Sequence, residues 1–400
     1  MPREVTKRKQ NSVIDEEAPT HPKKKVKANS SLASADSDDT TSTGDPPSKS
    51  SSSSNTLNLQ DLLDFSSLED EIAIGSRFDA IARVLMHEYQ LVVGRDVVET
   101  AFEIQEMEFY LQKAVCHEDP FTHGSEEQKV SGRWYFHRAP RRSVDASRSS
   151  TSLTGYRGGT RKGMDLTIGG PVPRNLSRYF SSKSSLVSGP SLLVDKILEL
   201  SGASSISELV ETMWGGDTDA FNPPTSSSSS SRTSYLYLKR ATATASALPK
   251  IHKSPRIGLD LSHPGTTVPN AQSSSMDYHP RVHFLPKLYR YYTRPEELIK
   301  GRPQAVYGFI HANLQFRLAN RSLSGDKVFR ALLAEGTGLK DALVEKYLAE
   351  FEAGEKAGFK HLRLCIGPNG KGVAGSATLY LKMMGALDAV LVFASARKSL

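Results

Sequence analysis

Cysteine is almost absent from this sequence, and long apolar runs are missing altogether. The two cysteines, Cys116 and Cys365, lie far apart among 400 residues and form no disulfide framework, which fits a reducing compartment. No stretch reaches the roughly 20 apolar residues that cross a bilayer, and the charged N-terminus is unlike a secretory signal. We therefore expect a soluble, intracellular protein without a membrane partner.

Positive charge is in excess, because the sequence has 51 Lys and Arg but only 44 Asp and Glu, which gives a net charge of +7. This balance favours a polyanionic partner. Two basic clusters, KRK at 7–9 and PKKKVK at 22–27, lie in a serine-rich stretch with too few apolar residues to fold. We predict that residues 1–56 form a disordered arm with a nuclear localisation signal for an import receptor. The alternative is a solvated basic tail.

Hydrophobic periodicity predicts a mixed α+β fold. Residues 76–90 have the spacing of a buried-face helix, and residues 97–110 alternate as a strand does. Residues 189–200 resemble an interior strand, and further strand patterns follow at 253–261 and from 282 towards 302. The type of the YLYLKRATA segment, and of the last forty residues, is left open by the pattern.

The domain organisation follows from where these patterns begin and end. We predict one domain over residues 57–310, built on a curved, mostly antiparallel sheet with surface helices. Polar, low-complexity insertions are expected at about 139–155, 215–234 and 263–280. Residues 311–400 have helical spacing and are predicted to form a helical C-terminal extension, whose role the sequence does not indicate.

Acidic and aromatic side chains alternate in the strand pattern that ends at residue 110. Glu106, Glu108 and Tyr110 share one face of an extended strand. A carboxylate among apolar groups loses solvation, so its pKa rises and it becomes a usable proton acceptor near neutral pH. The simpler alternative is a solvated edge strand with one buried face.

The order of seven short motifs over residues 78–300 resembles the alkyladenine (3-methyladenine, methylpurine) DNA glycosylase family. The motifs are VVETAFEIQEMEFY, HEDPFTH, GRWYFH, MDLTIG, SLLVD, SPRIGLDL and LPKLYRYY. The resemblance implies a glycosylase-like fold and hydrolysis of the N-glycosidic bond of a flipped, damaged purine.

The resemblance also implies a role for each matching residue. Glu108 matches the glutamate that activates water for attack on C1′ of the flipped nucleotide. Tyr110 and His123 match the groups that hold the extruded base on its two sides. Asp165 stands where the family has an asparagine at the purine edge, and His137 where it has a second stacking tyrosine.

A glycine-rich basic turn, GYRGGTRKG, lies before the MDLTI strand pattern, and its backbone can approach a phosphate closely. It lacks the Gly-Lys-Ser/Thr of nucleotide-hydrolase phosphate loops, so ATP use is not expected. Arg157, Arg161 and Lys162 are the predicted DNA-binding side chains. By the resemblance, Tyr156 is the wedge inserted into the duplex.

Three departures from the family pattern bear on the activity. The turn between Glu108 and His123 is longer than in the family. Val194 stands where the family usually has an arginine. Asp165 and His137 replace an amide and a phenol, which changes the exocyclic groups that the pocket would accept.

Other functions also fit parts of the sequence. A zinc site could use Cys116, His117, His123 and His137, although no CxxC or HExxH spacing is present. A nuclear, nucleic-acid-binding protein with weak or no catalytic activity would keep the fold and the charge. A protein-interaction scaffold could use the helical C-terminal third.

Taken together, the sequence favours a nuclear DNA repair enzyme of base excision repair. We expect a monomer that hydrolyses alkylated or deaminated purines from double-stranded DNA, with Glu108 as the catalytic base and no metal or organic cofactor. The reaction should be monofunctional, because the EMEFY stretch has no lysine to form a Schiff base. The preferred lesion, and whether RNA is also a substrate, are left open.

Overall fold

The computed structural model describes most of the chain beyond residue 57. The described residues are 58–122, 126–138, 156, 162–169, 175–177, 180–183, 189–224, 232–241, 247–269, 278–313, 315 and 322–396. Contacts group the described residues into one compact unit within Thr56–Leu400. The predicted arm and its basic clusters lie outside the described residues, as do residues 139–155 and the middle parts of the other two predicted insertions.

The main sheet is antiparallel and has the strand order β10-β11-β2-β1-β9, with β8 paired to β2 beside this path. Its strands are β1 (Tyr89–Arg95), β2 (Val98–Glu108), β8 (Phe180–Lys183), β9 (Ser234–Arg240), β10 (His252–Ser254) and β11 (Arg290–Tyr292). β1 and β2 form a hairpin in which Arg95 lies opposite Val98. Asp96 turns the chain with a φ of 54°, a left-handed conformation in which Asp is enriched.

Two smaller antiparallel sheets follow β2 in the chain, and the first of them begins directly after it. One contains β3 (Tyr110–Lys113), β4 (His117–Glu118) and β7 (Asn175–Ser177), and the other pairs β5 (Trp134–Phe136) with β6 (Met164–Leu166). A short 3-10 helix, η1 (Glu126–Lys129), precedes β5. These small sheets carry several of the predicted site residues.

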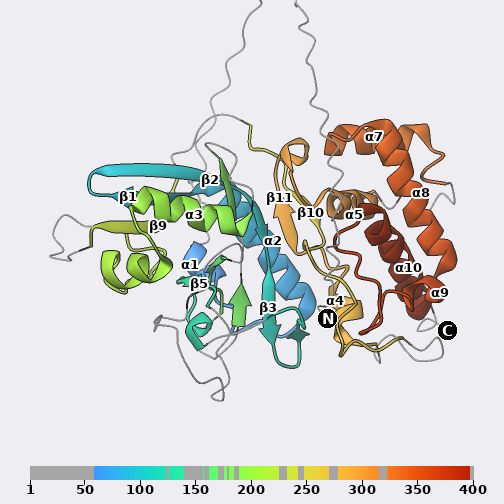
Figure 1. Cartoon of the computed structure of the whole chain (residues 1–400), viewed down its shortest axis with the longest axis horizontal. Coiled ribbons are helices and arrows are strands. Elements are labelled where there is room, and N and C mark those ends of the chain that lie inside the picture. Colours follow the sequence, from blue (N-terminus) through green and yellow to red (C-terminus); the bar gives the residue numbers. More distant parts are fainter. Residues whose placement is uncertain are drawn as a thin grey trace, which may run out of the picture. The chain divides into compact units, whose positions relative to one another are not determined.

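A first hydrophobic core forms where α1 (Leu59–Leu62), α2 (Glu71–Glu88) and α3 (Pro190–Ser201) pack against the strands. Asp70 begins α2, because its carboxylate accepts a hydrogen bond from the Ala73 N–H at 2.7 Å. The buried face of α2 includes Phe78 and Ile81. Figure 1 shows α3 lying beside β1, with which it is in contact. The segment η3 (Glu208–Met213) is a π-helix whose Leu209 and Val210 join the same core.

A second core is built mainly by the C-terminal helices. They are α5 (Arg302–Ala312), α7 (Lys327–Thr337), α8 (Asp341–Ala357), α9 (Phe359–Leu362) and α10 (Ala377–Ala396). The short helices α4 (Pro280–Phe284) and η5 (Pro295–Glu297) lie on either side of β11 in the chain. In Figure 1, α8 and α10 run side by side. No helix in the described parts of the chain is both long enough and apolar enough to span a bilayer.

The predicted α+β class is confirmed, with an antiparallel sheet and a helical C-terminal region. The expected helix at 76–90 is α2, which begins earlier at Glu71, and the strand pattern at 97–110 is β2 followed by β3. The YLYLKRATA segment, which the pattern left open, contains β9. The boundary near residue 310 stays a prediction.

The interior strand predicted at 189–200 is wrong, because these residues form α3. Pro190 is the first helical residue, a position where its missing N–H costs nothing, and Gly202 ends the helix with a φ of 72°. Leu193, Val194 and Ile197 are buried at helical spacing. The strands expected at 253–261 and from 282 are also shorter: β10 ends before Pro255, and α4 occupies the start of the second pattern.

The helices α8 and α10 approach closely because each has a glycine at the contact. A Cβ on Gly354 would overlap the carbonyl oxygen of Lys382, and a Cβ on Gly385 would overlap that of Phe351.

We predict that Gly385→Ala lowers the free energy of unfolding by about 1–3 kcal/mol through overpacking, as measured by urea denaturation. Gly75→Ala, on α2 with open space around it, should instead raise stability by about 0.5–1 kcal/mol. Equal effects of the two substitutions would contradict the close helix contact.

Candidate active site

Glu108 is the last residue of β2, and its side chain is only 5 % exposed. The main chain continues directly into β3 after Phe109, whose N–H donates to the carbonyl of Tyr289 at 2.8 Å. Glu108 and Tyr110 therefore stay on one face, as the strand alternation predicts. The Tyr110 hydroxyl donates a hydrogen bond of 2.8 Å to Oε2 of Glu108.

The other carboxylate oxygen of Glu108 is held by the SPRIG segment. The Ile257 N–H donates to Oε1 at 2.7 Å. This N–H is free for a side-chain acceptor because β10 ends at Ser254, Pro255 has no N–H to continue the ladder, and Gly258 turns the chain with a φ of 78°. A segment about 150 residues away in sequence thus fixes the orientation of Glu108.

A buried ion pair lies next to this carboxylate. The side chains of Arg256 and Asp119 are both fully buried, with Nη2 of Arg256 donating to Oδ1 of Asp119 at 3.1 Å. Nη1 of Arg256 also donates to the Phe109 carbonyl at 3.1 Å, and its Cζ lies 4.4 Å from the centroid of the Tyr110 ring. This guanidinium therefore fixes the backbone of Phe109 and the ring of Tyr110, the two residues that follow Glu108 in sequence.

A second buried arginine, Arg290, lies opposite Glu108 in the β11–β2 register. Its Nε donates to Glu106 at 2.6 Å, and Nη1 donates to the Ser254 hydroxyl and the Gly301 carbonyl, each at 3.1 Å. Arg290 thereby joins β2, β10 and the start of α5. We call Glu108, Tyr110, Asp119, Arg256 and Arg290 the Glu108 cluster.

Burial raises the pKa of Glu108 above its ordinary value of 4.5. The Ile257 N–H, the charge of Arg290 and the Tyr110 hydroxyl oppose this rise without cancelling it. Tyr380 on α10 is also buried, and its hydroxyl has no hydrogen-bond partner among the described residues. Burial raises the pKa of Tyr380, and the charges of Asp388 and Glu108 add to that rise. The charge of Glu108 therefore acts on a residue of α10.

His137 and Asp165 are brought together by the pairing of β5 with β6. Nε2 of His137 lies 3.1 Å from Oδ1 of Asp165, and Gln128 donates to Oδ2 at 3.2 Å. Both His137 and Asp165 are buried. Gly163 permits this arrangement, because a Cβ there would overlap the His137 ring. Asp165 therefore accepts hydrogen bonds at both of its oxygens.

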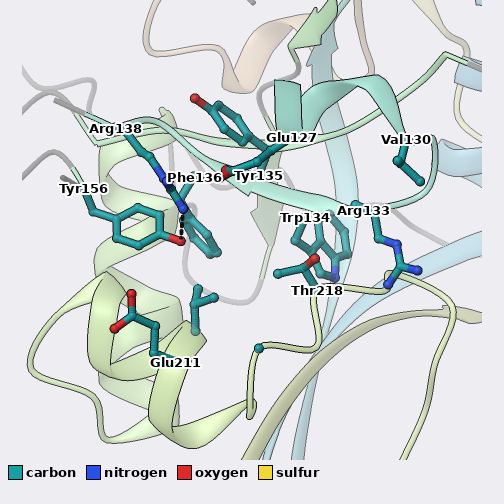
Figure 2. Close-up of a pocket in the computed structure, with 12 residues that line it drawn as sticks. Glu127, Val130, Arg133, Trp134, Tyr135, Phe136, Arg138, Tyr156, Glu211 and Thr218 are labelled. Atoms are coloured by element: carbon teal, nitrogen blue, oxygen red, sulfur yellow. Dashed lines mark hydrogen bonds and ion pairs between the residues drawn. The ribbon is translucent and has the colours of Figure 1, made fainter. Parts of the chain in front are cut away.

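Tyr156 lies on the wall of a cavity of about 460 Å³ (Figure 2). Its hydroxyl accepts a hydrogen bond from Nη2 of Arg138 at 3.0 Å, and the Arg138 guanidinium lies 4.5 Å from its ring centroid. Arg138 also pairs with Glu127 at 3.0 Å. Tyr135 and Glu211 are among the other residues that line the cavity. The predicted wedge residue is thus packed against an arginine at the edge of a hollow.

The remaining predicted site residues divide into two sets. His123, Arg157 and Arg161 lie outside the described residues. Lys162 is described, and its Nζ pairs with Asp195 at 2.6 Å. Its charge is therefore already engaged on the protein surface.

Val194 stands where the glycosylase pattern has an arginine. Val194 is fully buried on α3 among apolar side chains. Arg256 and Arg290 supply the positive charge near Glu108 instead. Sequence reasoning missed both arginines and Asp119 as site residues, although Arg256 and Asp119 lie within the SPRIG and HEDPF motifs.

The zinc alternative finds no complete ligand set in the described residues. No group of three or more Cys, His, Asp or Glu side chains able to hold a metal occurs among them. His117 has both ring nitrogens within hydrogen-bond distance of protein oxygens, the Leu111 carbonyl at 2.8 Å and the Tyr289 hydroxyl at 2.9 Å. Burial lowers the pKa of His117. This histidine is best described as a structural residue.

Comparison with known proteins gives no activity for this fold. The chain matches none of the protein-family models it was compared with. It is similar to Uncharacterized protein L759 of Acanthamoeba polyphaga mimivirus, with 28 % identity over 214 residues, covering 49 % of this chain and 82 % of the viral protein.

The buried Arg256–Asp119 pair should contribute strongly to stability. We predict that Asp119→Ala lowers the free energy of unfolding by about 3–5 kcal/mol, because it leaves an uncompensated charge in the interior. Asp195→Ala removes the partner of Lys162 at a site where the carboxylate is half exposed, and should cost at most about 1 kcal/mol. Urea denaturation measures both values. Similar costs for the two variants would show that the Asp119 pair is not isolated from solvent.

Proposed function

We propose that this protein is a DNA glycosylase that hydrolyses the N-glycosidic bond of alkylated or deaminated purines. The observation that carries the proposal is the Glu108 cluster: a buried carboxylate with a raised pKa, held at one oxygen by Tyr110 and at the other by the Ile257 N–H. Both holding groups belong to motifs on which the resemblance to alkyladenine DNA glycosylases rests. The glycosylase-like identity of the fold is part of the same proposal.

The chemistry assigns one task to the carboxylate. As the bond between C1′ and the purine nitrogen breaks, the electron pair leaves with the base and the sugar gains oxocarbenium character. Ionised Glu108 stabilises that positive charge and takes a proton from the water that forms the new bond at C1′. The products are a free base and an abasic site. Tyr110 and Ile257 orient the carboxylate for this step.

The base must leave the duplex before this reaction can occur, and aromatic or imidazole faces would hold it. We assign Tyr110, His123, His137 and Asp165 to that task. Because Asp165 already accepts from Gln128 and His137, it would select the base through the hydrogen bonds that it keeps or exchanges. Arg157 and Arg161 would contact DNA phosphates, as would Lys162 in exchange for its pairing with Asp195, and Tyr156 would support the gap left in the duplex.

A monofunctional reaction agrees with the surroundings of Lys113, the lysine of β3. Its Nζ is held by backbone carbonyls, among them Phe65 at 3.0 Å and Ser66 at 3.2 Å. A Schiff base requires a free, neutral amine next to C1′. Lys113 is instead a structural cation that ties β3 to the loop after α1. We place the enzyme in the nucleus as a monomer that acts in base excision repair without a cofactor.

A second candidate function is a nucleic-acid-binding protein without turnover. It is favoured because both oxygens of Glu108 and both oxygens of Asp165 already accept hydrogen bonds from protein groups. The cavity beside Tyr156 is not lined by Glu108. Such a protein would keep the positive charge and the fold and bind duplex DNA in a salt-dependent way.

Replacing the proposed base gives the most direct test. Duplex DNA carrying 3-methyladenine, 7-methylguanine or hypoxanthine should develop alkali-labile breaks with the wild-type protein. Glu108→Gln keeps the shape of the side chain but removes the proton acceptor, so we expect at least a 100-fold lower rate, in the range for loss of a general base. Glu103→Gln, an exposed position on the same strand, should cleave at the wild-type rate.

DNA binding separates the two candidate functions. Under the glycosylase proposal, Glu108→Gln still binds duplex DNA, and binding weakens steeply with salt. Salt-dependent binding by a wild-type protein that releases none of the three bases would favour the second function. An unchanged rate in Glu108→Gln would refute the assignment of the base.

The pH dependence of base release should report the raised pKa of Glu108. The ionised form is the active one, so activity should fall as pH drops through a pKa that lies above 4.5. Tyr110→Phe removes a hydrogen bond that favours the carboxylate. The acidic limb of the pH–rate profile should therefore move to higher pH in this variant. A limb that stays in place would show that Tyr110 does not set the pKa.

A further inference from the structure

A second cavity, of about 320 Å³, lies between the edge strand β10 and the helices α5 and α7. We call it the β10 cavity. It is lined by Lys250, Ile251, His252, Lys253, Leu288, Tyr292, Ala305, Gly308, Phe309, His311, Ala312, Asn313, Gly336 and Thr337. None of these residues belongs to the Glu108 cluster. The cavity is therefore a separate site.

The lining of the β10 cavity carries positive charge and contains no carboxylate. Lys250 is exposed and has no ion-pair partner among the described residues. Its charge lowers the pKa of the half-buried His252, although burial is the larger cause. Lys253 adds a second ammonium at the rim, where it pairs with Asp79 at 3.0 Å. An anion is the ligand that this set would attract.

Tyr292 provides an unused polar group inside the β10 cavity. The residue is only 2 % exposed, and no described residue makes a hydrogen bond to its hydroxyl. Its ring is held by His252, with ring centroids 5.6 Å apart, and by Arg290, whose Cζ lies 4.6 Å from its centroid. Burial raises the pKa of Tyr292 to about 12, so the hydroxyl stays protonated and can donate a hydrogen bond.

The opposite wall is rigid and partly apolar. Gly308 lets α5 lie directly on β10, because a Cβ there would overlap the Lys253 carbonyl. Asp388 is buried and holds His311, whose Nε2 lies 2.9 Å from Oδ2, so only Nδ1 remains for a ligand. Leu288 and Phe309 supply apolar surface. The cavity thus combines donors with space for a small apolar body.

We propose that the β10 cavity binds a small phosphate monoester that carries a ring. Lys250 and the Tyr292 hydroxyl contact the phosphate, and Phe309 and Leu288 contact the ring. The volume lies at the lower end of the range for small-molecule sites, which excludes a nucleic acid duplex from the interior. The proposal does not depend on glycosylase activity.

Phenyl phosphate is a suitable probe, with inorganic phosphate and phenol as its two halves. Calorimetric titration of the full chain should show one site that binds phenyl phosphate more tightly than either half. Lys250→Gln and Tyr292→Phe should each weaken binding at least tenfold. Lys346→Gln, an equal charge change at an exposed position on α8, should leave it unchanged, and so should Glu108→Gln.

Thermal denaturation of the variants keeps the test decisive. Lys250 is exposed and the Tyr292 hydroxyl has no described partner, so both variants should melt close to the wild-type temperature and gain less stability from phenyl phosphate. The proposal is overturned if phenyl phosphate does not bind at millimolar concentration. It is overturned likewise if phenol or inorganic phosphate binds as tightly as phenyl phosphate does. It is also overturned if Lys250→Gln and Tyr292→Phe bind like the wild type, or if Lys346→Gln weakens binding equally.

Discussion

The buried carboxylate of Glu108 is the constraint around which the first half of this fold is arranged. An ionised side chain loses much of its hydration when it is buried, so the protein must supply hydrogen bonds and positive charge in its place. Tyr110, the Ile257 N–H and Arg290 do so from three different strands or loops. They lower the pKa of Glu108 but leave it above the ordinary value. A charge kept at such a cost is typical of functional sites.

The second core, built mainly by the C-terminal helices, packs against the β10–β11 end of the main sheet and so supports the surroundings of Glu108. β10 and β11 form the end of the main sheet, and α5 packs on β10 through Gly308. Arg290 connects Glu106, Ser254 and Gly301, so its hydrogen bonds span both cores. The C-terminal helices therefore help to hold the segment that presents the Ile257 N–H to Glu108. This gives the helical region a positional role without any catalytic motif of its own.

Two of the departures from the glycosylase pattern, Asp165 and His137, are residues that contact each other. Where the family has an amide and a phenol, this chain has Asp165 and His137, and they lie 3.1 Å apart. A carboxylate and an imidazole satisfy each other, which an amide and a phenol do less strongly. The replacement is thus a matched pair and not two independent losses. Under the proposed function, it keeps a buried polar group beside the extruded base, with a different pattern of donors and acceptors.

Local sequence pattern determines several features of this fold without reference to tertiary contacts. The alternation over 97–110 gave the strand and the shared face of Glu108 and Tyr110, and helical spacing gave α2 and the helical C-terminal region. These features depend on period and on nearest neighbours, which are present in the sequence. The strand predicted at 189–200 failed because a short apolar run has no period that separates a buried strand from a helix, and the flanking Pro190 and Gly202 decided for α3. Only the tertiary structure joined Arg256 to Asp119, Ile257 to Glu108 and Tyr292 to the β10 cavity, because burial and charge pairing act between residues that are distant in sequence and leave no local signal.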